Sequence, residues 1–289
     1  MKCLIIGGSS YIAQAFMRCY QERVEITSLT RSSELQSYFD LTETHFKRYD
    51  AVINFAAIVH QKDPDLHQSQ KINTDLPLFL AQKAKEAGIR QFIQLSTIAV
   101  YSPLSTSITS KTATKPHSIY GKSKLAADEG LLAMQSDDFK VSIVRPPVIY
   151  GPNAPGNMQA LIRLIQKGWP LPFLYKKNQR TILYIENLTS ALYMMMTQQK
   201  AGIFLLRDEE QPSLATLTQN IKEVSDVKTL LFTPPKILIT WLVRFQQLPF
   251  YKLYGDLTID DQFAQQQLGH YQKSTLHTAL DKTMGGQWC

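Results

Sequence analysis

The sequence has few cysteines and no long apolar run. Three cysteines occur among 289 residues, at Cys3, Cys19 and Cys289, and no two share a Cys-x-x-Cys spacing. This scatter predicts reduced thiols, a cytoplasmic location and no metal site. The run Cys3–Ile6 is too short for a signal peptide, and no stretch approaches the ~20 apolar residues of a membrane span.

The sequence also lacks a strong excess of charge. Lys and Arg number 31 against 24 Asp and Glu, a net charge of +7, with no basic block of the kind that binds nucleic acid. Apolar residues at 44% and charged residues at 19% exclude a disordered or fibrous chain. Lys236–Phe250 is largely apolar and carries two cations, Lys236 and Arg244, and either a membrane surface or a small helical lid would suit it. The lid is the simpler interpretation, so we expect no membrane contact.

The N-terminal residues alternate between strand and helix patterns. A strand over Lys2–Ile6 enters a turn of small residues, Gly7–Ser10, and a helix over Ile12–Gln21 and a strand over Glu25–Leu29 follow. This layout is typical of a dinucleotide-binding unit, in which the free N–H groups at the helix N-terminus hold a pyrophosphate. A tight turn without a ligand is the alternative.

The alternation continues. Strands are expected over Ala51–Phe55, Gln91–Leu95 and Val141–Val144, with a helix over Pro77–Ala87. It predicts an α/β fold with a doubly wound parallel sheet, whose ligands bind at the carboxyl ends of the strands. We expect a Rossmann domain over residues 1–150 and a smaller, mostly helical substrate-binding domain over residues 151–289. A strand over Thr181–Ile185 is a candidate to return to the first domain.

Tyr120 and Lys124 are spaced so that a helix would place both on one face. A nearby ammonium stabilises a phenolate, so we expect Lys124 to lower the pKa of Tyr120 from its usual ~10. Taken alone the pair also fits an exposed helix start with a solvated lysine.

Five ordered blocks carry a family resemblance. They are Gly7–Ala13, Leu95–Tyr101, Tyr120–Lys124, Arg145–Gly151 and Arg180–Asn187. From Lys2 to about Leu280 the chain resembles the extended short-chain dehydrogenase/reductase family, in its branch of NAD(P)-dependent nucleotide-sugar epimerases, dehydratases and reductases. Within that branch it looks most similar to proteins that handle UDP-activated amino sugars for bacterial capsular polysaccharide.

The resemblance implies roles for particular residues. Tyr120 would be the general acid/base, Lys124 would assist it and bind the nicotinamide ribose, and Thr97 would hydrogen-bond the sugar oxygen. The UDP-sugar would contact Thr97, Asn157 and Arg180. The family also implies a homodimer. The cofactor-binding residues would be Gly7, Ser10, Tyr11, Ile12, Arg31, Asp40, Leu41, Ala56, Ala57, Tyr120, Lys124 and Pro147.

Two features depart from the family pattern. Ser10 and Ala13 stand where the turn usually has its second and third glycines, and the Cβ of Ser10 would restrict the backbone near the pyrophosphate. After the second strand the chain has Thr30–Ser32, with Arg31, in place of an acidic residue. A cation there favours the 2′-phosphate of NADP, so we expect NADP, with NAD as the alternative.

These features favour one reaction, reduction at C4 of a UDP-4-keto-6-deoxy-hexosamine for surface or capsular polysaccharide precursors. A UDP-sugar 4-epimerase is the alternative, and a non-catalytic NAD(P)-sensing protein is a second one. Dehydration is disfavoured, because Ile98 and Ala99 stand where the family's dehydratases carry Asp-Glu.

Overall fold

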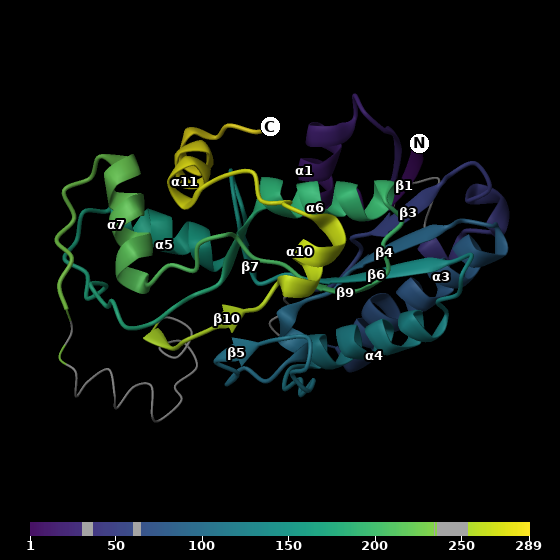
Figure 1. The fold of residues 1–289 in the computed structure, drawn as a ribbon, viewed down its shortest axis with the longest axis horizontal. Coiled ribbons are helices and arrows are strands. Elements are labelled where there is room, and N and C mark those ends of the chain that lie inside the picture. Colours follow the sequence, from purple (N-terminus) through teal and green to yellow (C-terminus); the bar gives the residue numbers. More distant parts are fainter. Residues whose placement is uncertain (31–36, 60–64, 234, 236–253) are drawn as a thin grey trace.

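A computed structural model describes residues 1–30, 37–59, 65–233, 235 and 254–289. Its main sheet has six parallel strands in the order β2-β1-β3-β4-β6-β9 (Figure 1). The strand order reverses between β1 and β3, and this reversal creates a crevice at the carboxyl ends of these strands. The doubly wound parallel sheet is therefore confirmed. The strands are β1 (Lys2–Ile6), β2 (Glu25–Leu29), β3 (Ala51–Asn54), β4 (Gln91–Leu95), β6 (Lys140–Arg145) and β9 (Gly202–Leu205).

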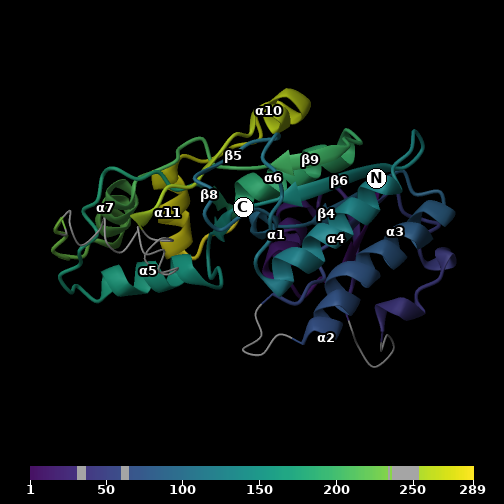
Figure 2. The same cartoon turned by 90° about the horizontal axis from the view of Figure 1, so that it is seen from below.

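Helices cover both faces of the main sheet (Figures 1 and 2). One face carries α1 (Tyr11–Tyr20) and α6 (Ile185–Thr197), and the other carries α3 (Leu76–Glu86) and α4 (Ile119–Ala133). A separate hydrophobic core fills each face, because strands of a parallel sheet present apolar side chains to both sides. Short helical segments precede α3 or follow strands: η1 (Tyr38–Asp40), η2 (Glu43–His45), α2 (Leu66–Gln70), η3 (Lys71–Asp75) and η4 (Ile98–Val100).

A second group of helices lies beyond the carboxyl end of the main sheet (Figure 1). It consists of α5 (Asn157–Gln166), α7 (Leu214–Ser225) and α11 (Leu276–Gly285). Two small parallel sheets lie between this group and the main sheet, with α10 (Gln262–Leu268) near β9. They pair β7 (Val148–Tyr150) with β8 (Ile182–Tyr184), and β5 (Ser107–Ile108) with β10 (Thr258–Ile259).

The expected strand over Thr181–Ile185 is β8, and it pairs with β7 outside the main sheet. Pro146 and Pro147 follow β6 and lack N–H donors, so the chain leaves the main sheet there. The segment that returns to the main sheet is β9, which the sequence analysis did not predict. The domain boundary near residue 150 stays a prediction.

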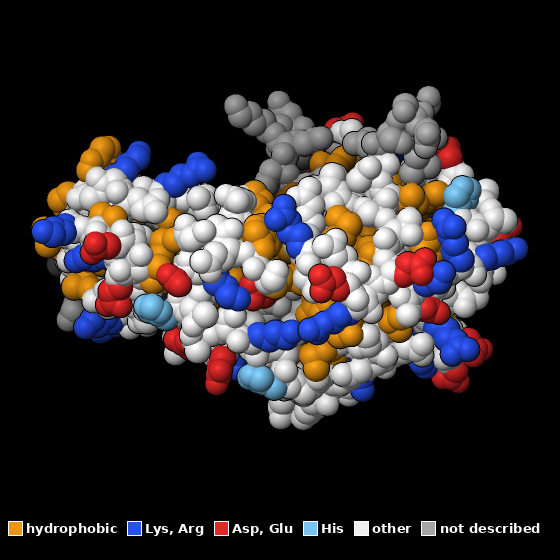
Figure 3. Space-filling model, turned by 90° about the horizontal axis from the view of Figure 1, so that it is seen from above, with side chains coloured by type: hydrophobic (Ala, Val, Ile, Leu, Met, Phe, Trp, Pro, Cys, Tyr) orange, Lys and Arg blue, Asp and Glu red, His pale blue; other side chains and the backbone are white. Residues whose placement is uncertain are grey.

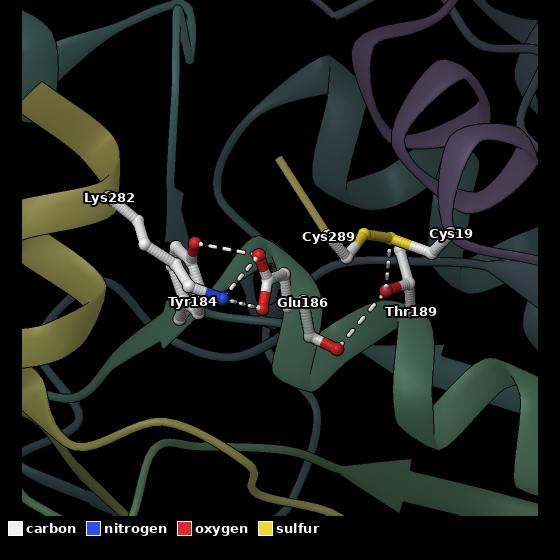
Figure 4. The surroundings of a disulfide bond; sticks show 6 residues. All are labelled: Cys19, Tyr184, Glu186, Thr189, Lys282 and Cys289. Carbon is white, nitrogen blue, oxygen red and sulfur yellow. Dashed lines mark hydrogen bonds and ion pairs between the residues drawn. A yellow bond between two sulfur atoms is a disulfide. The ribbon is translucent and has the colours of Figure 1, made fainter. Parts of the chain in front are cut away.

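A disulfide joins Cys19 in α1 to Cys289, with their Cα atoms 5.4 Å apart (Figure 4). The prediction of reduced thiols is wrong for this pair, whereas Cys3 is a free, buried cysteine. The pairing follows from the path of α11, whose Lys282 Nζ forms an ion pair with Glu186 Oε2 of α6 at 2.9 Å. Because α6 packs beside α1, the segment after α11 reaches the N-terminal helix.

No helix within the described ranges is long and apolar enough to cross a bilayer. The expectation about Lys236–Phe250 concerns a segment outside the described residues. On the face in Figure 3, basic and acidic side chains are interspersed among apolar ones.

Candidate active site

The turn after β1 is built around Gly7, whose φ is +79°. Its N–H donates to the carbonyl of Leu29 at 3.0 Å, which joins the turn to β2. A Cβ on Gly7 would lie 2.6 Å from the backbone N of Ala56. Glycine is therefore required here both by the positive φ and by the close approach of the chain after β3.

Ser10 fits the turn without strain. Its φ is −68°, a value that any residue adopts, and its Oγ accepts a hydrogen bond from Ala13 N at 3.1 Å as the cap of α1. Ala13 is fully buried, as expected for the small residue that allows the helix to pack on the sheet. The backbone at Ser10 therefore carries no strain. The effect of its Cβ on the approach of a pyrophosphate stays a prediction.

A cleft of about 970 Å³ opens beside this turn. Its walls come from the turn itself, the ends of β2 and β3, and the α2–η3 segment, so it occupies the crevice where the strand order reverses. Of the predicted cofactor-binding residues, Gly7, Ser10, Ala56 and Ala57 line it. The cleft is also lined by residues that the sequence analysis did not assign, among them Ser9, Thr30, Tyr38, Phe39, His67 and Lys71.

Tyr11 and Ile12 have side chains that pack on the hydrophobic core of the α1 face, outside the cleft. The Tyr11 ring lies 5.7 Å from that of Trp288, and its buried hydroxyl has no hydrogen-bond partner among the described residues. Any contact of these two residues with a phosphate would therefore come from their backbone N–H groups at the N-terminus of α1.

Three other predicted cofactor residues, Asp40, Leu41 and Pro147, do not line the cleft. Asp40 is exposed and Leu41 is buried in the core of the α3 face, next to Phe39, which does line the cleft. Pro147 is buried between β6 and β7. Arg31 lies outside the described residues. The roles assigned to these four residues stay predictions.

Tyr120 and Lys124 lie on the first two turns of α4, as the spacing predicts. Ser118 caps this helix, and its Oγ accepts from Gly121 N at 3.0 Å. Gly121 packs directly on the backbone carbonyl of Ala99 in η4, where a Cβ would overlap the oxygen. This close contact places the first turn of α4 beside η4, and the hydroxyl of Thr97, just after β4, acts on Tyr120 as a hydrogen-bond partner that lowers its pKa. The three predicted catalytic residues thus form one cluster.

Burial controls the acid–base state of this cluster. It raises the pKa of Tyr120 to about 12, although the hydrogen bond from Thr97 acts in the opposite direction. Burial also lowers the pKa of Lys124 to about 8, opposed by the charge of Asp128. The pKa of Tyr120 in the protein alone is therefore raised and not lowered as expected, because desolvation of the phenolate outweighs the hydrogen bond with Thr97. The effect of Lys124 on Tyr120 stays a prediction.

A buried polar network lies behind the cluster and was not predicted from the sequence. Asp128 Oδ2 accepts hydrogen bonds from Ser96 Oγ at 2.8 Å and from Arg145 Nε at 2.9 Å. Arg145 Nη1 in turn donates to the hydroxyl of Tyr101 at 2.8 Å. The available signal was the position of Asp128, four residues after Lys124 and on the same helix face.

Asn73 connects α4 to the cleft. Its Oδ1 accepts from Ile58 N at 2.8 Å, and its Nδ2 donates to Ile58 O at 3.0 Å and to Ser123 Oγ at 3.2 Å. Ile58 lines the cleft, and Ser123 directly precedes Lys124. The π-helical turn η3 that carries Asn73 therefore fixes α4 relative to the cleft.

The two residues predicted to contact the sugar nucleotide lie beyond the main sheet, at the start of α5 and just before β8. Asn157 is exposed at the start of α5, and Arg180 is half-buried, with Nη1 donating to Gly255 O at 3.3 Å. Both assignments to the substrate stay predictions.

The residues present fit a nicotinamide dinucleotide. The cleft ends at the N-terminus of α1, where free N–H groups and the helix dipole favour a pyrophosphate. Lys124 Nζ is fully buried, has no hydrogen-bond partner among the residues that the structure describes and does not line the cleft, so its contact with a ribose hydroxyl stays a prediction. The described ranges contain no group of His, Cys, Asp and Glu that could hold a metal ion.

The chain is similar to known proteins in both sequence and fold. It is 28% identical to the UDP-glucose 4-epimerase of Vibrio cholerae over 258 residues, 83% of this chain and 77% of that protein. The UDP-glucuronic acid 4-epimerase of Bacillus cereus, solved with NAD, shares the fold with a TM-score of 0.78 at 15% identity, covering 99% of this chain and 96% of that one. A dTDP-4-dehydrorhamnose reductase of Clostridium acetobutylicum superposes with a TM-score of 0.75 at 18% identity, covering 99% of both chains.

Solved structures with this fold include complexes with NAD and with NADPH. Residues 3–205, more than half of the chain, match the NAD dependent epimerase/dehydratase family. The matched segment contains the dinucleotide turn, the cleft and the cluster of Thr97, Tyr120 and Lys124. The chain therefore belongs to the NAD dependent epimerase/dehydratase family.

Proposed function

We propose that the protein is an NADP-dependent reductase that reduces a UDP-4-keto-6-deoxy-hexosamine at C4, in the synthesis of surface or capsular polysaccharide precursors. The observation that carries the proposal is the grouping of Thr97 after β4 with Tyr120 and Lys124 on α4, where Ile98 and Ala99 stand in place of the acid pair of a dehydratase. The phenol of Tyr120 is protonated at neutral pH, as an ordinary tyrosine with a pKa of ~10 is. A protonated phenol is the group that a ketone reduction requires, because the new alkoxide must receive a proton.

Each residue of the cluster has a separate task in this reaction. When bound, a reduced nicotinamide cofactor supplies the hydride for the sugar C4. Tyr120 donates its proton to the C4 oxygen as negative charge develops there, and the hydroxyl of Thr97 orients that oxygen. Lys124 contributes positive charge in a buried environment, where it stabilises the phenolate left on Tyr120 more strongly than it would in water.

The preference for NADP rests on the cations near the adenosine end of the cleft. Arg31 follows β2 in the sequence, and Lys71 lines the same cleft as Thr30 and Ser10. Cations at this place favour a cofactor with an additional phosphate. Binding of the UDP diphosphate by Arg180 and Asn157, assembly as a homodimer and a cytoplasmic location are further parts of the proposal that rest on the family resemblance.

A UDP-sugar 4-epimerase is the second candidate. The similarity to the Vibrio cholerae UDP-glucose 4-epimerase over most of the chain favours it. An epimerase must first remove a proton from the C4 hydroxyl, which requires Tyr120 to ionise. The reductase is preferred because Arg31 stands after β2 in place of the acidic residue that binds the ribose of NAD, which favours NADP.

The test compares the two reactions directly. The protein is incubated with NADPH and a UDP-4-keto-6-deoxy-hexosamine, and separately with UDP-glucose or UDP-N-acetylglucosamine without added cofactor. We expect stoichiometric NADPH oxidation in the first reaction and no conversion in the second. Interconversion of a UDP-hexose without net cofactor change would establish the epimerase instead. A protein that binds NADPH and converts neither substrate would match the sensing alternative.

Substitution of the phenol tests the catalytic assignment. Tyr120→Phe should lower kcat by ~10²–10⁴-fold, because it removes the proton donor while the ring still fills its site. Tyr193→Phe is the matched control, since Tyr193 stacks on Tyr20 at 4.4 Å on the α1 face of the sheet and should retain full activity. Wild-type turnover in Tyr120→Phe would exclude Tyr120 as the acid.

A further inference from the structure

Asp128 joins the catalytic helix to the ends of two strands. The residue is completely buried on α4, one turn after Lys124 and two turns after Tyr120. Its Oδ2 accepts hydrogen bonds from Ser96 Oγ, just after β4, and from Arg145 Nε, at the end of β6. Ser96 directly precedes Thr97, so this carboxylate is connected to both strands beside the cluster.

Two buried polar atoms near Asp128 are left without hydrogen-bond partners in the described part of the chain. They are its own Oδ1 and Lys124 Nζ. Both belong to side chains that are at most 1% exposed, and their opposite charges attract each other. A buried ammonium with no partner loses its proton readily, so a carboxylate one helical turn away decides how much of the charge remains.

We propose that Asp128 is a positioning residue that keeps the Lys124 ammonium charged inside the protein and holds it toward the cofactor. The inference rests on the proposed function of Tyr120 and Lys124. Asp128 acts through Lys124 and contacts neither cofactor nor substrate. Because Ser96 and Arg145 both bond Oδ2, Oδ1 is the oxygen left without a partner, and the charge of the carboxylate acts on the Lys124 ammonium through their electrostatic attraction.

The groups that surround Asp128 allow this effect to be isolated. Lys124 and Tyr120 share its helix, Arg145 faces it from β6, and Tyr101 contacts Arg145 with its hydroxyl and its ring. Arg145 stays charged over the accessible pH range, so it contributes a constant field. Lys124 is then the group near Asp128 whose charge changes around neutral pH, since its pKa lies at about 8.

The test measures the titration of Lys124 in the protein without cofactor or substrate. Protein labelled with ¹³C at the lysine Cε is titrated by NMR, and the resonance is assigned with Lys124→Met. We expect a midpoint of about 8 in the wild type. Asp128→Asn should lower the midpoint by about one pH unit or more, because the opposing charge is gone. Ser96→Ala removes one hydrogen bond from the carboxylate without changing its charge and should leave the midpoint in place, and Asp128→Glu should restore it.

Cofactor affinity gives the functional readout. Loss of the ammonium in Asp128→Asn should weaken NADPH binding on the order of fivefold near pH 8 and by less than about twofold near pH 6, where Lys124 is protonated again. A merely structural role would weaken binding equally at both pH values. Neither readout needs a sugar substrate, so failure of the proposed reaction would leave both intact.

Three results would overturn the proposal. One is an unmoved Lys124 midpoint in folded Asp128→Asn. Another is an equal shift in Ser96→Ala, which would indicate general loosening. If Asp128→Asn does not fold, the same measurements are made on Asp128→Ser, a second neutral variant that leaves room for water beside Arg145. Failure of both neutral variants to fold, with Asp128→Glu folded, would make the carboxylate a requirement of the fold and would also reject the inference.

Discussion

Gly121 allows the sharpest test of how the cluster is assembled. The residue follows Tyr120, and an added Cβ would overlap the backbone carbonyl oxygen of Ala99. Backbone atoms cannot rotate away as a side chain can, so Gly121→Ala must move the first turn of α4 away from η4. Because Thr97 precedes η4 and Tyr120 lies on that turn, the displacement separates the two hydroxyl groups.

The magnitude follows from two opposing effects. Alanine in a helix interior gains ~1 kcal/mol over glycine. Overpacking against a rigid neighbour costs ~1–3 kcal/mol, so the net loss of folding free energy should be about 1 kcal/mol. Activity should fall much further, because a misplacement of ~1 Å at a reacting group can cost ~10²-fold in rate. We therefore expect a large loss of kcat with a small loss of stability.

Gly130 provides the matched control on the same helix. A Cβ there would approach only the end of the Leu78 side chain, at 2.6 Å from Cδ2, and that side chain can change its rotamer. Gly130→Ala should therefore keep wild-type kcat and a melting temperature within a few degrees of the wild type. The assay measures NADPH oxidation and thermal unfolding for both variants. Wild-type kcat in Gly121→Ala would refute the claim that this contact positions Tyr120.

Two further predictions concern stability. Cys19→Ser, or reduction of the wild type, should lower the melting temperature by roughly 5–10 °C. The disulfide closes a loop of 270 residues, and such cross-links contribute ~2–4 kcal/mol of stability. An unchanged melting temperature under reductant would contradict the bond. Burial raises the pKa of Asp208 from its usual 3.8 to about 6, so its stabilising contribution is complete below pH 3.8 and is lost as pH rises through about 6. Chemical unfolding should therefore show stability falling across this window in the wild type and not in Asp208→Asn, and equal slopes would contradict the assignment.

Much of the fold was predictable because its signals are local. Gly7 is demanded by the dihedral angle of one turn, and the strands of the first half follow from short apolar runs between turn residues. The spacing of Tyr120 and Lys124 placed both on one helix face. The strand β9 was missed because Gly202–Leu205 is short and has no alternating pattern to distinguish it from a loop.

Tertiary structure decided what depends on neighbours distant in the chain. Asp128 meets Ser96 across 32 residues and Arg145 across 17, and Cys19 meets Cys289 across 270. No periodicity records such contacts, because they form only when separate elements pack. The pKa of Tyr120 was predicted in the wrong direction for the same reason. The sequence by itself determined which residues share a turn or a helix face, whereas the packed structure determined how much water each charge loses, and desolvation is set by every neighbour in space.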